Sequence, residues 1–211
     1  MIIDIFRATT AICAAFSNQI KTIIPVKTIE EALKYRGNDY ILASERHGKK
    51  IEGFDLGNSP EGFLDPSLRN KTIVLSTTNG TNAILSASGA DIIMIGSFLN
   101  ISAITQKLIH INKDIILLCA GWQDKFNLED TVFAGALTEI LAVGFDISQD
   151  DSAFCALQLY QFAKNDMKSF LLKSSHYNRL KHLNLEADIL FSLKIDETHI
   201  VPYFDGYAII C

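Results

Sequence analysis

The sequence contains few cysteines, and they lie far apart. Cys13, Cys119, Cys155 and Cys211 have no C-x-x-C spacing, which excludes a disulfide framework and a zinc site. Scattered thiols of this kind are typical of a reducing compartment, so we expect a cytoplasmic protein.

Long hydrophobic runs and stretches of a single charge are also missing. No apolar run approaches the roughly 20 residues that cross a bilayer, and the first residues do not resemble a cleavable signal, so we expect no membrane partner. The formal net charge is −5 and the Lys and Arg residues form no stripe, which argues against a nucleic-acid partner. With 211 residues, 48 % of them hydrophobic, we expect one globular domain over 1–211, with two lobes (about 1–145 and 146–211) as the alternative.

Apolar runs alternate with helical patterns over the first two thirds of the chain. Strands are expected at 1–6, 21–26, 40–43, 72–75, 92–95 and 115–118. This rhythm predicts an α/β fold, with a mostly parallel sheet flanked by helices on both faces. From Asp150 onward the pattern is helical, with one last short strand expected at 198–202.

Right-handed crossovers place the strand-to-helix loops of such a sheet at one edge, where binding sites form. We therefore expect distant segments to meet there. These are the segments around Asp4, Glu45, Thr77, Ser97 and Gly121. Asp4 and Arg7 lie at the first junction, where Thr9 or Thr10 is expected to cap the following helix.

The stretch 44–60 has neither a helical nor a strand period and contains three glycines. A long irregular loop in a compact chain is more often functional than idle. Arg46, Lys49 and Lys50 are predicted to hold an anion. Glu45, Glu52 and Asp55 are predicted to hold a hard cation such as Mg²⁺. The alternative is a solvated loop whose charges serve only solubility.

Segments 76–81 and 96–100 each lie between a strand and a helix. A helix N-terminus offers unpaired N–H groups, and the hydroxyls of 76–81 add donors, so this segment is predicted to bind an anion. N-capping alone is the alternative, and 96–100 is a weaker copy. Neither segment is a P-loop or a dinucleotide fingerprint.

Glu129 and Asp130 open a helix, where acidic residues either complement the helix dipole or bind Mg²⁺. Because Mg²⁺ prefers one or two carboxylates plus water and phosphate, only two or three of the candidate carboxylates are expected to touch it. The candidates are Asp4, Glu45, Asp55, Glu129 and Asp130.

Two familiar phosphatase chemistries do not fit. Asp4-Ile5-Phe6 lacks the D-x-D of an aspartyl-phosphate enzyme, and Cys119 is followed by Lys125 where a cysteine phosphatase has arginine. His176, after two serines, is the better of two histidine candidates for a general acid.

Six ordered blocks together resemble the 2-phosphosulfolactate phosphatase (ComB-like) family. They are I-D-I-F-R-A-T-T (3–10), E-R-H-G-K-K-I-E-G-F-D-L-G-N-S-P (45–60), T-T-N-G-T (77–81), G-S-F-L-N (96–100), C-A-G-W (119–122) and L-E-D-T (128–131). The resemblance implies a Mg²⁺-dependent, acid-type phosphatase that is usually a homodimer. It implies a small anionic phospho-ester substrate, (R)-2-phospho-3-sulfolactate, and a step of coenzyme M synthesis.

The resemblance and the residue chemistry together define the candidate site. The catalytic candidates are Asp4, Arg7, Glu45, Arg46, Lys49 and Asp55. The substrate-binding candidates are Thr9, Thr10, Asn58, Ser59, Thr77, Thr78, Asn79, Gly80, Thr81, Ser97, Asn100 and Gly121.

The chain departs from the family pattern in three places. About two dozen residues that usually precede the Asp4 block, including a lead-in to the first strand, are missing. His47 stands where the family usually has glycine, and Asn82 where it has arginine. These departures favour two alternatives: a phosphatase for another small phospho-acid, and a non-catalytic anion-binding relative.

Overall fold

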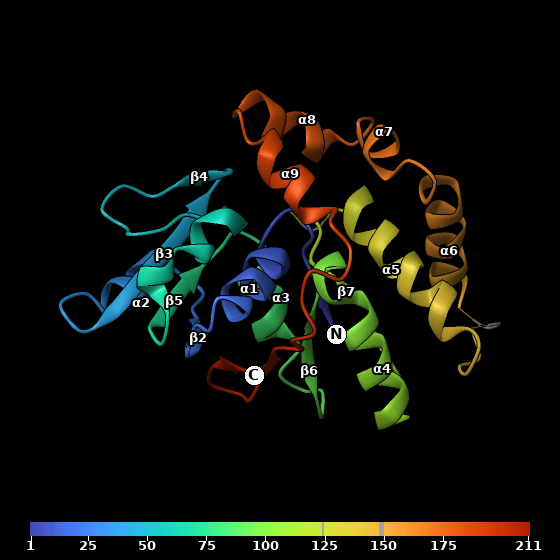
Figure 1. The fold of residues 1–211 in the computed structure, drawn as a ribbon, viewed down its shortest axis with the longest axis horizontal. Coiled ribbons are helices and arrows are strands. Elements are labelled where there is room, and N and C mark those ends of the chain that lie inside the picture. The colour runs from blue at the N-terminus through green and yellow to red at the C-terminus, as the bar shows by residue number, and fades with distance from the viewer. Residues whose placement is uncertain (124, 148–149) are drawn as a thin grey trace.

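The computed structural model describes residues 1–123, 125–147 and 150–211 (Figure 1). Its strands are β1 (Ile2–Ile3), β2 (Thr22–Pro25), β3 (Tyr40–Arg46), β4 (Lys49–Lys50), β5 (Thr72–Ser76), β6 (Ile93–Gly96), β7 (Leu118–Cys119), β8 (Tyr203–Phe204) and β9 (Ile209–Ile210). Its α-helices are α1 (Ala8–Ser17), α2 (Ile29–Leu33), α3 (Gly80–Ser86), α4 (Ile101–Ile111), α5 (Leu128–Leu141), α6 (Asp151–Ala163), α7 (Met167–Leu171), α8 (Ser175–His182) and α9 (Glu186–Ser192). Short 3₁₀ helices are η1 (Pro60–Leu64), η2 (Pro66–Leu68) and η3 (Phe98–Asn100).

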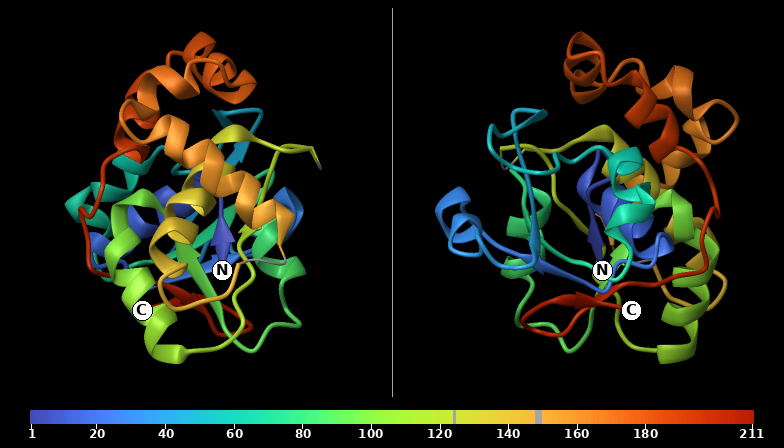
Figure 2. Two further views of the ribbon diagram at one scale, coloured as in Figure 1. Left: turned by 90° about the vertical axis from the view of Figure 1, so that its right-hand side faces the viewer. Right: turned by 60° about the vertical axis from the view of Figure 1, so that its left-hand side comes forward.

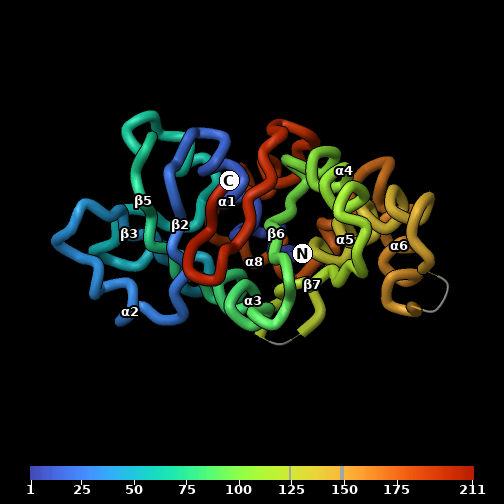
Figure 3. The backbone as a smooth tube through the Cα atoms, turned by 90° about the horizontal axis from the view of Figure 1, so that it is seen from below, coloured from blue at the N-terminus to red at the C-terminus, as the bar shows by residue number. Residues whose placement is uncertain are grey.

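The strands form one sheet in the order β4-β3-β5-β2-β9-β8-β6-β1-β7. Strands β3, β5 and β2 are parallel to one another, and so are β6, β1 and β7. The antiparallel hairpin of β8 and β9 joins these two groups, and Figure 3 shows it between β2 and β6. The α/β fold predicted from the sequence is confirmed.

Alternate strand residues face different parts of the core, as the period of two requires. Ile73 in β5 and Ile95 in β6 belong to one central cluster, which also contains the apolar residues of α1. Val74 faces the opposite side, in a cluster that includes Ala32 of α2. Met94 likewise faces a separate cluster formed with α4 and α5. Helices therefore cover both faces of the sheet.

The C-terminal hairpin bends the sheet. Three antiparallel pairings separate β2 from β6, so a flat sheet would send the two parallel groups in opposite directions. However, the residues that pair with the hairpin are Ile23 in β2 and Ile93 and Met94 in β6, near the starts of those strands. The carboxyl ends of both parallel groups therefore meet at one pocket, which is lined by residues at or just after the ends of β1, β3, β5 and β7.

The expected cap of the first helix is wrong. Helix α1 begins at Ala8, and Thr9 and Thr10 lie inside its first turn without exposure to solvent. Thr9 Oγ1 accepts a hydrogen bond from the Asp4 N–H at 3.0 Å, and Thr10 Oγ1 donates to the Ile5 carbonyl at 2.9 Å. Their hydroxyls therefore hold the turn before the helix in place, because a threonine hydroxyl competes well for nearby backbone groups.

The interpretation of 44–60 as wholly irregular is also wrong at its start. Strand β3 continues through Arg46 and turns back into β4, where Glu45 pairs with Lys50. The turn contains His47, which has a left-handed φ of 55°. Glycine is favoured in that conformation because it has no Cβ, which gives a physical reason for the glycine usual in the family.

The strand predicted at 198–202 is misplaced. The last strands are β8 and β9, each two residues long, and Thr198 donates its N–H to the Leu99 carbonyl outside any strand. Two-residue strands have no readable period, so neither strand of this hairpin was predictable from hydrophobic alternation.

The C-terminal helices pack closely on the rest of the chain. Figure 2 shows α6 lying along α5, and a Cβ added to Gly135 of α5 would lie 2.0 Å from the Ala156 carbonyl oxygen of α6. Phe133 and Tyr177, which lie on opposite sides of the predicted lobe boundary near residue 145, belong to one buried cluster. The division into two lobes stays a prediction. Among the described residues, no helix combines the length and apolarity that crossing a membrane demands.

Candidate functional site

A pocket of about 90 Å³ lies where the strand ends meet α8. Its lining combines residues from four strand ends with residues of the C-terminal helical part. The lining residues are Asp4, Phe6, Arg7, Glu45, His47, Gly48, Asn58, Thr78, Asn79, Trp122, His176, Arg179, Leu180 and Leu183. The predicted convergence of the segments around Asp4, Glu45 and Thr77 is therefore observed.

Asp4 follows β1 directly and is only 7 % exposed. Its Oδ1 accepts a hydrogen bond from the Ala8 N–H at 3.3 Å, while Oδ2 has no hydrogen-bond partner among the described residues. Burial raises the pKa of Asp4 from 3.8 to about 6, and the charges of Glu45 and Glu129 act in the same direction. The electrostatic interaction with His176 and the hydrogen bond from the Ala8 N–H both lower the pKa of Asp4 and so oppose this rise. Asp4 is thus a buried carboxyl with one oxygen available to a ligand.

Gly80 allows α3 to approach Asp4 closely. A Cβ at this position would lie 2.4 Å from the Ala8 Cβ and 2.8 Å from Asp4 Oδ2, both too short for real contacts. Glycine at the first residue of α3 therefore leaves room for the Asp4 carboxyl, which is a requirement of space and not of backbone freedom.

Glu45 lies near the end of β3 and is 7 % exposed. Its Oε1 accepts a hydrogen bond from the Gly48 N–H across the β3–β4 turn. The Thr78 hydroxyl lies 3.4 Å from both carboxylate oxygens of Glu45, at the limit for a hydrogen bond. The pairing of β3 with β5 brings these two residues together, because Ser44 lies opposite Ser76.

Asp130 is fully buried beneath the pocket, in the first turn of α5. Its two oxygens accept hydrogen bonds from the Ile5 N–H at 2.8 Å and the Gly121 N–H at 3.2 Å. Burial, together with the charges of Asp4 and Glu129, raises the pKa of Asp130 well above its ordinary value. Asp130 thus joins the segments after β1 and β7, and Gly121 contributes its backbone to this link.

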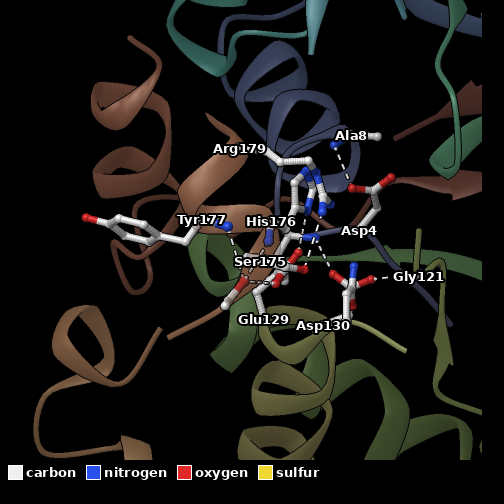
Figure 4. A network of polar contacts seen from close by, with 12 residues as sticks. Asp4, Ala8, Gly121, Glu129, Asp130, Ser175, His176, Tyr177 and Arg179 are labelled. Atoms are coloured by element: carbon white, nitrogen blue, oxygen red, sulfur yellow. Dashed lines mark hydrogen bonds and ion pairs between the residues drawn. The ribbon is translucent and has the colours of Figure 1, made fainter. Parts of the chain in front are cut away.

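Glu129 is also fully buried, and it faces α8. Its Oε1 lies 2.6 Å from His176 Nδ1, and its Oε2 accepts a hydrogen bond from the Ser174 hydroxyl at 3.3 Å (Figure 4). The ring of His176 also makes an edge contact with Phe6. A carboxylate on Nδ1 fixes the orientation of an imidazole and leaves Nε2 for a ligand.

Arg7 forms a buried ion pair with Asp188 of α9. The two side chains are 3 % and 5 % exposed, and a second guanidinium nitrogen donates to the Gly48 carbonyl at 2.9 Å. Asp188 also accepts a hydrogen bond from the Ser59 hydroxyl at 2.7 Å. The predicted residues Arg7 and Ser59 therefore meet through a carboxylate that lies 181 residues from Arg7 in the sequence.

Arg179 extends from α8 over the ring of Trp122, with its guanidinium carbon 3.9 Å from the ring centroid. Gly121, with φ of +64°, precedes this tryptophan in a tight turn closed by Lys125. Figure 4 shows the side chains of Asp4, His176 and Arg179 next to one another.

Other predicted residues lie outside the lining of the pocket. Arg46 donates to the Ser76 carbonyl and hydroxyl, at 3.1 and 2.8 Å, and so ties β3 to β5. Lys49 is exposed on β4, and the exposed Asp55 accepts a hydrogen bond from the Leu42 N–H at 2.8 Å. Their roles in catalysis stay predictions that this geometry does not favour.

The remaining polar candidates are engaged in local structure. Thr77 and Thr81 bond to each other's backbone at the start of α3. The Asn100 side chain accepts a hydrogen bond from the Ser97 N–H at 3.0 Å, and its amide donates to the Ile200 carbonyl at 2.9 Å. Asn58 Oδ1 and Ser97 Oγ are buried without a hydrogen-bond partner among the described residues, and of these two residues only Asn58 lines the pocket.

The donor set fits a hard cation better than a soft one. Asp4 and Glu45 line the pocket with carboxylate oxygens, and the described residues contain no cluster of three His, Cys, Asp or Glu side chains arranged for a metal. Mg²⁺ needs only one or two carboxylates beside water and phosphate. Glu129 and Asp130 are fully buried and lie outside the lining of the pocket, whereas Asp4 and Glu45 line it, so Asp4 and Glu45 are the better candidates for ligands.

Sequence reasoning did not find Asp188 or Arg179. Asp188 stands in a short apolar segment, and Arg179 stands among basic residues at the end of a helix, where cations complement the dipole. No spacing linked either residue to the site, because both reach it through the packing of the C-terminal helices.

Known proteins resemble this chain over nearly its whole length. A family model described as 2-phosphosulpholactate phosphatase matches residues 1–206. The chain belongs to this family. A relative from Caldicellulosiruptor saccharolyticus is 42 % identical over 217 residues, covering 99 % of this chain and 90 % of the relative.

Two further relatives carry the same name, probable 2-phosphosulfolactate phosphatase. One from Caldanaerobacter subterraneus subsp. tengcongensis is 37 % identical, and the alignment covers 96 % of this chain and 86 % of the relative. One from Clostridium beijerinckii is 38 % identical, and the alignment covers 100 % of this chain and 90 % of the relative. The family predicted from the six sequence blocks is thereby confirmed.

Proposed function

We propose that this chain hydrolyses 2-phospho-3-sulfolactate to 3-sulfolactate and phosphate. The observation that carries the proposal is one pocket lined by Asp4, Glu45, Arg7 and Arg179 in a chain of this family. The substrate has a phosphate, a carboxylate and a sulfonate. Its site therefore needs several cationic groups and hydrogen-bond donors beside any metal ligands, and the pocket combines both kinds of group.

We propose Mg²⁺ as the cofactor, with Asp4 and Glu45 as its protein ligands. When bound, Mg²⁺ supplies charge stabilisation at the phosphoryl oxygens and a position for the attacking water. The free Oδ2 of Asp4 and the position of Glu45 in the lining of the pocket support this assignment. Asp130 holds the turn that carries Asp4, since it accepts the Ile5 N–H.

Hydrolysis forms a bond from water oxygen to phosphorus and breaks the bond from phosphorus to the C2 oxygen of the substrate, which must gain a proton. His176 is the candidate donor, because it lines the pocket and Glu129 fixes its Nδ1. Arg7 lines the same pocket, where Asp188 holds its guanidinium in place, and its remaining N–H donors are proposed to bind phosphoryl oxygens. No covalent phospho-enzyme is required.

Phosphate release from 2-phospho-3-sulfolactate tests this proposal. Activity should rise with Mg²⁺, disappear in chelator, and fall at least about 1,000-fold in Asp4→Asn. An exposed control variant, Asp91→Asn, should retain full activity because the Asp91 carboxylate is exposed and pairs with Lys113 at the surface. Equal activity in chelator would contradict Mg²⁺ as the cofactor. If no phosphate is released from this substrate, the proposed reaction is contradicted.

A second candidate is hydrolysis of another small phospho-acid. His47 supports it, because this residue lines the pocket in place of the glycine usual in the family. An imidazole at the rim changes the space and charge offered to the far end of the substrate. Comparing kcat/KM for 2-phospho-3-sulfolactate, 2-phospholactate and 2-phosphoglycerate separates the two candidates. The alternative gains if a compound without sulfonate is the best substrate.

We further propose that the reaction serves coenzyme M synthesis and that the protein is a cytoplasmic homodimer. The support for these points is the family membership. Light scattering on the purified protein tests the dimer, and a mass near 23.4 kDa would contradict it.

A further inference from the structure

The two arginines in the pocket differ in their partners. Arg7 is neutralised by the buried carboxylate of Asp188. Arg179 forms no ion pair with a carboxylate among the residues that the structure describes. It is held by the face of Trp122 and by a hydrogen bond from Nη1 to the Ser175 hydroxyl at 3.3 Å. Arg179 therefore presents an unneutralised guanidinium to the pocket.

The surroundings of Arg179 favour an anionic ligand. Partial burial lowers the pKa of Arg179, while the charge of Glu129 nearby raises it, so the cation is desolvated without a direct counter-ion. A guanidinium has five N–H donors, and only Ser175 accepts from Arg179 within the described part of the chain. Stacking on Trp122 fixes the guanidinium plane but uses none of its donors. Its donors therefore remain for a ligand.

The acid groups of the substrate divide between the two sides of the pocket. The phosphate belongs with Asp4 and Glu45, where the metal ligands lie. A carboxylate suits Mg²⁺ as a ligand, so it also belongs on that side. A sulfonate is a weaker ligand that stays ionised, and the weakly hydrated guanidinium is its better match.

We propose that Arg179, stacked on Trp122, binds the sulfonate of the substrate and so determines specificity. This inference rests on the proposed function, because it assigns one part of that substrate to one residue. Specificity of this kind is strong, since a site built to hydrogen-bond a group rejects an analogue that lacks the group.

Three substrates and two variants test the assignment. The substrates are 2-phospho-3-sulfolactate, 2-phospholactate (no sulfonate) and 2-sulfoethyl phosphate (no carboxylate). Arg179→Met should lower kcat/KM about 100-fold for both sulfonated compounds and less than about threefold for 2-phospholactate. The matched control Lys181→Met removes an exposed cation from the same helix and should change none of the three values. An equal loss on all three substrates, or a loss confined to compounds with a carboxylate, overturns the assignment.

Calorimetry separates this inference from the proposed reaction, because it needs no turnover. The wild-type protein should bind 3-sulfolactate at least about tenfold more tightly than lactate, and Arg179→Met should remove that difference. If no phosphate is released from any substrate but this binding difference is found, the reaction fails and the sulfonate site stands. Equal binding of 3-sulfolactate and lactate by the wild-type protein overturns the sulfonate site.

Discussion

The buried pair of Arg7 and Asp188 provides the sharpest test of how the pocket is built. Both side chains are nearly inaccessible, and Asp188 also accepts the Ser59 hydroxyl, so removing the carboxylate leaves a buried cation and an unpaired hydroxyl. Breaking a buried ion pair on one side costs about 3–5 kcal/mol, because the remaining charge is uncompensated. For a chain of this size that corresponds to a Tm lowered by roughly 6–20 °C.

The predicted variants separate charge from packing. Asp188→Ala and Arg7→Met should each be strongly destabilised. The double variant Arg7→Met, Asp188→Leu should recover most of the loss, since apolar replacement of a buried pair is often neutral or stabilising. The double variant should nevertheless release phosphate at least about 100-fold more slowly, because Arg7 no longer faces the phosphoryl group.

Thermal unfolding by circular dichroism measures these differences. The exposed pair of Asp91 and Lys113, whose side chains are 78 % and 58 % exposed, is the internal control. Asp91→Ala should change the free energy of unfolding by less than about 1 kcal/mol. The reasoning is refuted if Asp188→Ala is no more destabilising than Asp91→Ala, or if the double variant loses the sum of the two single losses.

Three further predictions follow from the same geometry. In chelator, the free energy of unfolding of the wild-type protein should fall relative to that of Asp4→Asn by up to about 3 kcal/mol as the pH rises from 4 to 7. The reason is that the Asp4 carboxyl has a pKa of about 6 in the folded state and 3.8 in the unfolded state, so it favours folding only while it is protonated. A constant difference between the two proteins in urea unfolding would contradict this. Gly80→Ala should destabilise the protein by about 1–3 kcal/mol and impair phosphate release through the contact with Asp4, whereas Gly89→Ala, which meets nothing within 4 Å, should be neutral; comparable behaviour in thermal melts and assays would argue against the close approach. His176→Gln should lower kcat by about 100- to 10,000-fold with a far smaller change in KM, and an unchanged kcat would remove it as the proton donor.

The sheet was predictable from sequence because its central strands are continuous apolar runs. Segments such as 72–75 and 92–95 are rich in β-branched residues and are buried except for Thr72 and Ile92 at their starts, so their pattern carries the fold class. The hairpin of β8 and β9 was not predictable, because its strands are too short for a period. The bend it introduces depends on tertiary pairing alone.

The residues of the candidate site were predictable where a charged side chain follows a strand directly. Asp4 and Glu45 were found because polar residues interrupt apolar runs, and the structure places both in the pocket. Asp55 carries the same signal but satisfies a backbone N–H outside the pocket. Charge alone does not tell a ligand from a structural acceptor, and Asp188 gave no signal because only folding brings it to Arg7.

The central claim is that distant acidic and basic side chains serve one ion and one phosphate ester. A crystal structure with Mg²⁺ and phosphate tests it most directly. We predict one ion bound by the carboxylates of Asp4 and Glu45, with a phosphate oxygen completing its ligands inside the same pocket. An ion or a phosphate bound elsewhere, with Asp4 and Glu45 contacting neither, would contradict the account.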